Sequence, residues 1–188
     1  MEIDESKVEG LLSKKWTLCT EKDKREGLYW YLHAHDFALS LALRYDLPLN
    51  QVAGIIAALS PRNRWSGNKK DAEKVLENFR QGLEITQATF SSPFPKATNV
   101  NKILDGVPPE ETLGQKSRSF YRCIYNPLCD DVCIDTWAAR AVDYTEKWIS
   151  KKDYPILQGC YRKVARELSL VPSSFQAVIW VYERGGGE

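Results

Sequence analysis

One carboxylate in the sequence stands where it could do chemistry. The stretch VCIDTWAARA, residues 132–141, is apolar up to Asp135 and then takes the pattern of a helix. An aspartate just before a helix is usually an N-cap, which accepts first-turn N–H groups and stabilises the helix by about 1 kcal/mol. A carboxylate carried inward by an apolar segment can instead stabilise positive charge on a substrate. Both interpretations stay open, and Trp137 and Arg140 would let a polyanion lie beside Asp135.

A second group of polar residues forms a basic turn. In SPRNRWSGNKK, Arg62 and Arg64 have the charge to contact phosphates, and Asn63 between them can hydrogen-bond a base edge. Trp65 can stack on a base or wedge between bases, and Lys69 adds a further charge. The alternative is a solvated loop between helices with Trp65 facing the core, because basic turns are common.

A third group opens another expected helix, in LGQKSRSFYR. Gly114 would let the backbone of a partner approach closely, and Lys116 and Arg118 offer donors near the start of the helix. Free N–H groups and the helix dipole favour an anion at that end. Gly114, Gln115, Lys116 and Arg118 are therefore candidate contacts for a phosphate, and the alternative is a glycine-initiated helix with a basic exposed face.

The elements that must position these groups are predicted to be helices. Apolar residues recur at intervals of three and four, as in Val52, Ile55, Ile56 and Leu59, whereas few alternating stretches typical of strands remain. We predict an all-α fold of seven or eight helices. They are expected over residues 28–45, 51–60, 66–79, 97–104, 117–125, 136–149, from about 154 onward, and from 172 onward.

Capping residues mark some of the helix ends. Asn50 is expected to cap the helix that Pro61 ends, and Ser173 and Gln176 have the spacing of a capping box. The charge run TEKDKREG, residues 20–27, is most simply a solvated connector or the end of a helix.

Length and composition favour one folded domain. The 188 residues suffice to bury a core, and 43% apolar content with six tryptophans argues against disorder. No apolar run approaches the roughly eighteen residues of a membrane span, so we expect no membrane contact. We expect one compact domain over residues 1–188, with 28–184 as the core and 1–27 as a loosely packed N-terminal extension.

Charge and cysteine usage say less about partners. A net charge of +1, from 26 bases and 25 acids, neither demands nor forbids a polyanion. Five cysteines are an odd number without paired CxxC spacing, which favours free thiols, and Cys129 and Cys133 lack a second ligand pair at zinc-finger spacing. The acidic start MEIDESKVEG does not resemble an export signal. We expect a cytoplasmic or nucleoid-associated monomer without a metal.

Taken in order, these segments resemble the helix-hairpin-helix superfamily of base-excision DNA glycosylases, the endonuclease III and MutY-like group. VAGIIAALSPRNRWSGNKKDAEKVLENF resembles the family's helix, wedge loop and following helix, and KATNVNKILDGVPPEETL the segment before the hairpin. VCIDTWAARA resembles the stretch with the catalytic aspartate, and VPSSFQAVIWVYERG the closing helix. The resemblance covers approximately residues 52–184 and lies in order and spacing more than in identity.

The resemblance implies roles for particular residues. Asp135 matches the catalytic aspartate, and Lys116 falls near the lysine that some members use as a nucleophile. Arg62, Asn63 and Arg64 fall in the loop that fills the gap left by an extruded base. Because TLGQKSRSF keeps only one of the two hairpin glycines, we favour a phosphate contact for Lys116 and a monofunctional enzyme.

The implied activity is cleavage or exchange of an N-glycosidic bond in DNA, on a duplex with one extruded modified or damaged base. A carboxylate beside the sugar would stabilise its developing positive charge. Aromatic content suggests Tyr29, Trp30, His33 and Trp137 as walls of the base pocket. The family's four-cysteine iron–sulfur loop has no counterpart, so we expect no cluster and no other cofactor.

Three alternatives remain. The chain could be a non-catalytic DNA-binding or DNA-modification accessory module in which Asp135 is only a cap. It could be a protein-interaction domain that has lost DNA contact. A metal hydrolase built on HAHD is disfavoured, because His33 and His35 point to nearly opposite sides of a helix and cannot easily share an ion with Asp36.

Overall fold

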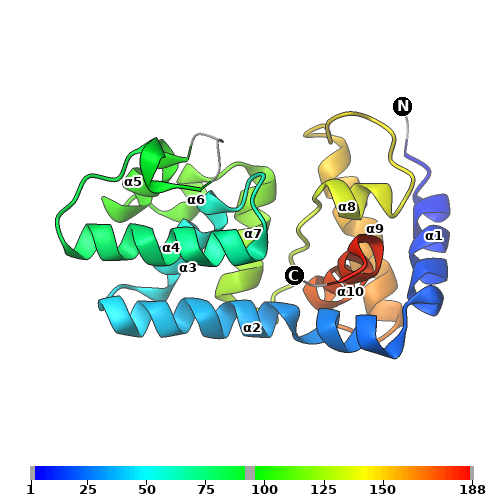
Figure 1. Cartoon of the computed structure of the whole chain (residues 1–188). Helices are drawn as coiled ribbons and strands as arrows, with labels where there is room; N and C mark the ends of the chain where they lie inside the picture. The colour runs from blue at the N-terminus through cyan, green and yellow to red at the C-terminus, as the bar shows by residue number, and fades with distance from the viewer. Residues whose placement is uncertain (1–2, 92–95, 187–188) are drawn as a thin grey trace. The chain divides into compact units, whose positions relative to one another are not determined.

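The computed structural model describes residues 3–91 and 96–186 and confirms the all-α prediction. These ranges contain ten α-helices, one 3₁₀ helix and no strand (Figure 1). The α-helices are α1 (Glu5–Leu18), α2 (Glu21–Tyr45), α3 (Leu49–Leu59), α4 (Trp65–Arg80), α5 (Ala97–Leu104), α6 (Pro109–Thr112), α7 (Gln115–Tyr125), α8 (Thr136–Arg140), α9 (Asp153–Glu167) and α10 (Pro172–Arg184). The 3₁₀ helix η1 (Gln87–Thr89) follows α4.

The described residues form two compact units. Unit 1 comprises residues 3–33 and 126–186, and unit 2 comprises residues 34–91 and 96–125. Helix α2 belongs to unit 1 up to His33 and to unit 2 beyond it. That the chain forms a single domain stays a prediction.

Unit 1 is built around α9 and α10. Helix α1 packs against both, and α10 also packs against α8. Tyr161 and Phe175 are fully buried in this core, together with Leu12 of α1. Because Val8 and Leu12 of α1 are buried in this core, the expectation of a loosely packed segment over residues 1–27 is wrong for α1.

Helices α2 and α10 cross closely within unit 1. A Cβ atom at Gly27 would lie 2.3 Å from the Cα atom of Val178. No real Cβ atom tolerates such a distance, so the crossing requires glycine at this position.

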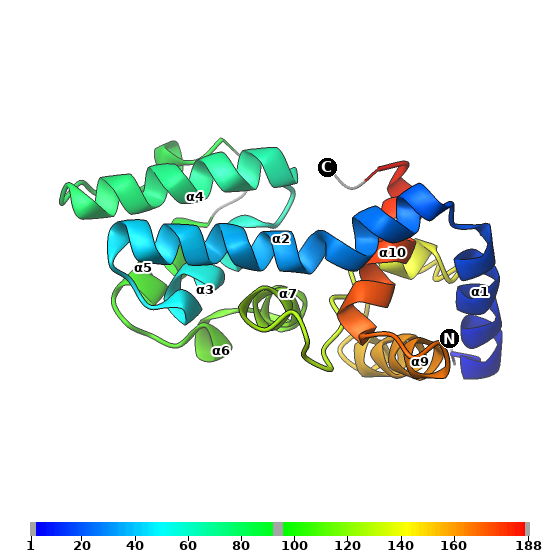
Figure 2. The ribbon, with the colours of Figure 1, turned by 90° about the horizontal axis from the view of Figure 1, so that it is seen from below.

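Unit 2 is built around α3. This helix packs against α4, α5, α6 and α7, which surround it in Figure 2. Every residue from Val52 to Leu59 is buried. Because α3 is covered on most sides, its sequence is apolar almost throughout, as expected for a central helix.

The charge run at residues 20–27 forms the beginning of a helix, which is the second of the two predicted interpretations and excludes a connector. Helix α2 begins at Glu21, and Thr20 and Asp23 form a reciprocal cap. The Asp23 carboxylate accepts from the Thr20 N–H at 2.8 Å, and the Thr20 hydroxyl accepts from the Asp23 N–H at 3.1 Å. This capping box satisfies first-turn donors and allows charged residues to start a helix.

Two predicted caps are wrong. Helix α3 starts at Leu49 after Pro48, without a side-chain cap, so Asn50 lies inside the helix. Helix α10 also lacks a side-chain cap. The Ser173 hydroxyl donates to the Pro127 carbonyl at 3.0 Å, and Gln176 accepts from the Tyr31 hydroxyl at 3.3 Å. Tertiary partners have taken both side chains of the expected capping box.

The helix predicted over 136–149 is wrong beyond Arg140. Helix α8 ends there, and Asp143 adopts a left-handed conformation with φ 56°. The Tyr144 N–H donates to the Ala139 carbonyl at 3.1 Å, and the Asp143 N–H to the Arg140 carbonyl at 3.0 Å. This is the Schellman pattern, with aspartate in place of the usual glycine.

Candidate functional site

Asp135 is the N-cap of α8, as its position in the sequence suggests. The lead-in Val132, Cys133 and Ile134 is buried, and the Ile134 N–H donates to the Tyr154 hydroxyl at 3.0 Å. The Asp135 backbone is extended, with φ −98° and ψ −175°. Oδ1 of its carboxylate accepts from the backbone N–H groups of Trp137 at 3.0 Å and Ala138 at 2.8 Å. One carboxylate oxygen is thus used by an ordinary cap.

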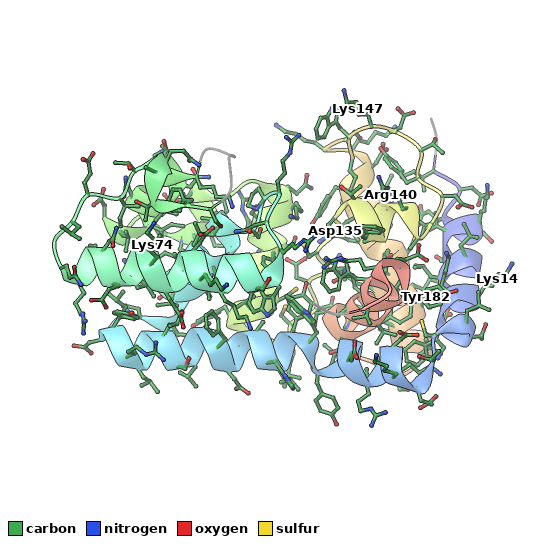
Figure 3. All side chains as sticks on the ribbon, in the orientation of Figure 1. Lys14, Lys74, Asp135, Arg140, Lys147 and Tyr182 are labelled. Carbon is green, nitrogen blue, oxygen red and sulfur yellow. The ribbon has the colours of Figure 1, made fainter. Side chains whose placement is uncertain are left out.

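The other carboxylate oxygen has a partner far along the chain. Oδ2 of Asp135 accepts from the indole Nε1–H of Trp180, on α10, at 3.0 Å. The Asp135 side chain is half-buried, and Figure 3 labels it at the start of α8. Three N–H donors therefore hold this carboxylate in a fixed orientation.

Aromatic and cationic groups surround this pair. The Trp30 ring packs edge-on against the Trp180 ring at 5.5 Å between centroids, and the Arg184 guanidinium lies 4.4 Å from the Trp180 centroid. We call Asp135, Trp180, Trp30 and Arg184 the Asp135 cluster. All four side chains are half-buried, so the cluster reaches the surface of unit 1.

Trp137 and Arg140 lie on α8 beside the cluster. The guanidinium of Arg140 lies 5.2 Å from the Trp137 ring centroid, in a cation–π arrangement. Arg140 is exposed (Figure 3), as a contact to a polyanion requires.

The Asp135 carboxylate affects the pKa of a buried tyrosine in unit 1. Tyr161, fully buried on α9, donates its hydroxyl to the Ala138 carbonyl at 2.9 Å. Burial and the nearby carboxylate of Asp135 raise the pKa of Tyr161 well above its usual value. Tyr161 therefore stays neutral and holds the short helix α8 in place.

The four proposed pocket walls differ in exposure. Trp30 belongs to the Asp135 cluster, and Trp137 is half-buried on α8. Tyr29 is 53% exposed and His33 is also exposed, and their rings lie 6.4 Å apart, centroid to centroid. Because Tyr29 and Trp30 are adjacent on α2, their side chains leave the helix in different directions. A role in base binding stays a prediction for all four.

The basic turn between α3 and α4 lies in unit 2. The Asn63 N–H donates to the Ser60 carbonyl at 3.1 Å and closes the turn. Arg62 adopts a left-handed φ of 51°, which costs a non-glycine residue on the order of 1 kcal/mol. Arg62 and Arg64 are both exposed. The turn thus presents two guanidinium groups on the surface of unit 2.

The Asn63 side chain stabilises this turn by hydrogen bonds within unit 2. Its amide Nδ2 donates to the carboxylate of Asp71 at 2.9 Å and to the Leu59 carbonyl at 3.4 Å. Asp71 is buried and also accepts from the backbone N–H of Ser91 at 3.0 Å. The amide predicted to read a base edge therefore already has partners within unit 2.

Trp65 packs inside unit 2. Its ring lies edge-on to Phe37 at 5.9 Å, and the ammonium of Lys69 lies 5.9 Å from each ring. Trp65 is half-buried. The Trp65 ring therefore already has aromatic and cationic neighbours within unit 2, and a role in base stacking stays a prediction.

The start of α7 carries the third group. Gly114 and Gln115 are exposed, and Lys116 is half-exposed. The Arg118 N–H donates to the Gly114 carbonyl at 2.8 Å, which makes Gly114 the N-cap. A Cβ atom there would meet nothing within 4 Å, so no neighbour in the described structure demands glycine.

Arg118 is engaged within unit 2. Its Nη2 donates to the Leu113 carbonyl at 2.9 Å, and its Nε lies 3.8 Å from the carboxylate of Glu110. Glu110 also accepts two hydrogen bonds from Arg122, at 2.8 and 2.7 Å. Arg118 thus has a structural role that its basic character did not reveal.

Sequence reasoning missed one buried amine. Lys96 is only 2% exposed, and its Nζ donates to the Leu59 carbonyl at the end of α3. Burial lowers the pKa of Lys96 from 10.5 to about 8; Asp71 opposes this shift and Lys116 adds to it. Nothing in KATNVNKIL distinguishes this lysine from a solvated one, because its partners lie far away in sequence.

The HAHD segment shows no metal site. His35 pairs through Nδ1 with the Ile124 carbonyl at 2.9 Å, and His33 packs beside Tyr29. Within residues 3–91 and 96–186, the grouping of three potential ligands is Glu5, Glu9 and Cys160, which includes no histidine. All five cysteines are free thiols.

Comparison with known proteins gives a family without a known activity. A family model matches residues 2–186. The chain belongs to DUF7178, a family of unknown function. No curated protein and no solved structure matches the chain. Among the described residues, none of the DUF7178 member's helices is long and apolar enough to cross a membrane.

The buried amine predicts a pH dependence of stability. The folded pKa of Lys96, about 8, lies below the unfolded value of 10.5, so between these values the unfolded chain binds the additional proton. The burial penalty is full below pH 8 and is relieved as pH rises. Relative to Lys96→Met, the wild type should gain about 2 kcal/mol of unfolding free energy between pH 7 and 9.5. Urea denaturation at several pH values measures this; a constant difference would contradict it.

The open N-cap predicts opposite effects on stability and DNA binding. In Gly114→Ser the hydroxyl should cap first-turn N–H groups and stabilise the protein by about a few tenths of a kcal/mol. The same N–H groups would then be less available to a phosphate, so DNA affinity should fall several-fold. Thermal melting and fluorescence anisotropy with a labelled duplex measure the two effects. Gly159→Ser, at a similarly open glycine on α9, is the matched control for affinity.

Proposed function

We propose that this protein is a DNA glycosylase-like enzyme that flips a modified or damaged base and cleaves or exchanges its N-glycosidic bond. Asp135 is the carboxylate that acts at the sugar. The observation that supports this most is the state of Asp135, half-buried and held by three N–H donors. A fixed, ionised carboxylate is what a reaction that develops positive charge on a sugar requires.

The surroundings of Asp135 suit a nucleotide. The half-buried rings of Trp30 and Trp137 offer apolar faces near the carboxylate, and base–aromatic stacking contributes about 1–3 kcal/mol per base. Arg140 and Arg184 supply positive charge in the same unit. Together these groups fit an extruded nucleotide better than a small neutral metabolite.

Unit 2 supplies the proposed DNA contacts. The exposed Arg62 and Arg64, and Lys116 at the start of α7, are cations suited to phosphates on an extruded strand. We assign Lys116 to phosphate rather than to nucleophilic attack, so the proposed enzyme is monofunctional.

The second candidate is a DNA-binding accessory module. The two bonds to Oδ1 are those of any aspartate N-cap, so the cap alone would explain why α8 begins at this residue. In that case the basic residues would still bind DNA, but no base would be released.

The DNA partner is tested first by the salt dependence of duplex binding. Each phosphate contact contributes about 0.9 to the slope of log K against log salt. Arg62→Ala/Arg64→Ala/Lys116→Ala should therefore flatten the slope by about 2 to 3 and weaken binding to all sequences. Anisotropy titrations between low and moderate salt measure this.

A matched variant controls for total charge. Lys14, Lys22 and Lys102 are exposed on other helices, and their triple alanine variant removes the same three charges. It should leave the slope close to that of the wild type. An equal loss in both variants would point to unspecific attraction, and absence of wild-type binding at low salt would refute the DNA partner.

Asp135→Asn separates catalysis from capping. Asparagine caps a helix about as well as aspartate, so the fold should persist. Base release from duplexes with modified bases should fall by roughly two to three orders of magnitude, because the neutral amide cannot stabilise positive charge. Duplex affinity should stay within about twofold of the wild type. Unchanged release in the variant would exclude the assigned role, leaving the accessory module.

A further inference from the structure

The two oxygens of the Asp135 carboxylate have unequal surroundings. Oδ1 accepts from two backbone N–H groups, which fill the usual acceptor directions of a carboxylate oxygen. Oδ2 accepts one bond, from the Trp180 indole. Oδ2 therefore has the larger remaining capacity to face a reacting group.

We infer that Trp180 is a positioning residue for Asp135, and that Oδ2 is the oxygen presented to the sugar. The inference rests on the proposed function, because it specifies how that carboxylate is held. Trp180 itself touches no reacting atom in this scheme; it acts through Asp135.

The indole that holds Oδ2 is itself fixed. Trp30 packs edge-on against it with an interplanar angle of 66°, and Arg184 lies over the ring. Its neighbours on α10, Ile179 and Val181, are fully buried in the core. The N–H direction is therefore set by packing before any ligand binds, which is the condition for electrostatic preorganisation.

A capping role does not require this bond. The cap of α8 is complete with Oδ1 alone, and a half-buried indole N–H could be satisfied by water. The Trp180 bond instead fixes the rotation of the carboxylate about its Cβ–Cγ bond. A hydrogen bond to an ionised acceptor is also among the stronger ones.

Asp135→Asn tests the bond without DNA. Indole N–H signals of the six tryptophans can be recorded by ¹H–¹⁵N NMR, and Trp180→Phe identifies the signal of Trp180. In Asp135→Asn the amide cannot serve as acceptor for the helix N–H groups and for the indole equally well. The Trp180 signal should shift far more than that of Trp148, whose ring is 71% exposed. An unmoved Trp180 signal would refute the hydrogen bond.

A pair of DNA probes tests positioning. One duplex carries a pyrrolidine abasic-site analogue, whose cation lies where positive charge develops on the sugar; the other carries the neutral tetrahydrofuran analogue. Transition-state mimics bind more tightly than neutral analogues. The wild type should prefer the cationic duplex, and Trp180→Phe should reduce the ratio of the two affinities roughly tenfold. Affinity for the neutral duplex should stay unchanged, which also shows that the variant is folded.

Two further variants separate the possible failures. Asp135→Asn should abolish the preference for the cationic duplex, and Trp148→Phe, at a 71% exposed ring, should retain it. If Asp135→Asn loses the preference and Trp180→Phe keeps it, the proposed function stands and the positioning role of Trp180 is refuted. If the wild type shows no preference, the proposed function itself fails. If Trp180→Phe unfolds, Phe variants of the other five tryptophans assign the Trp180 signal by elimination, and an unmoved signal in Asp135→Asn then refutes the bond on which the positioning role rests.

Discussion

The hydrogen bonds of Asp135 are the constraint on which helix α8 and the candidate site depend. Helix α8 has only five residues, too few to persist in water without tertiary support. The Asp135 cap holds its beginning, Tyr161 binds its Ala138 carbonyl, and the Schellman turn at Asp143 closes its end. Because Trp180 ties the same carboxylate to α10, the candidate site is as rigid as the helices beneath it.

In unit 2, too, buried polar side chains support the segment that carries the exposed residues. Its basic turn is supported by Asn63 and Asp71, while Lys96 holds the carbonyl at the end of α3. These polar atoms form hydrogen bonds within unit 2. Arg62 and Arg64, in the same turn, are exposed. Burial, and not residue type, therefore separates the polar residues that stabilise the fold from those that are available to a ligand.

Local patterns in the sequence predicted the helices well where the signal was apolar spacing. Helix α5 was predicted over 97–104, as found, and α4 and α7 differ by one or two residues at their ends. Prediction failed where side-chain chemistry decides a boundary, as in the Thr20–Asp23 cap and the left-handed Asp143. The position of Asp135 was likewise readable, but its partner Trp180 lies 45 residues away in sequence, and no local pattern could predict the pairing.

The close crossing of α2 and α10 makes a residue without functional atoms part of the site's geometry. Gly27 meets the backbone at Val178, and one helical turn further along α2 lies Trp30, whose ring braces Trp180. Only glycine, which has no Cβ atom, allows the two helix backbones to approach this closely. Any side chain at Gly27 would push α2 away from α10 and so move the Trp30 ring away from the Trp180 indole. The surroundings of the Asp135 carboxylate therefore depend on the absence of a side chain at residue 27.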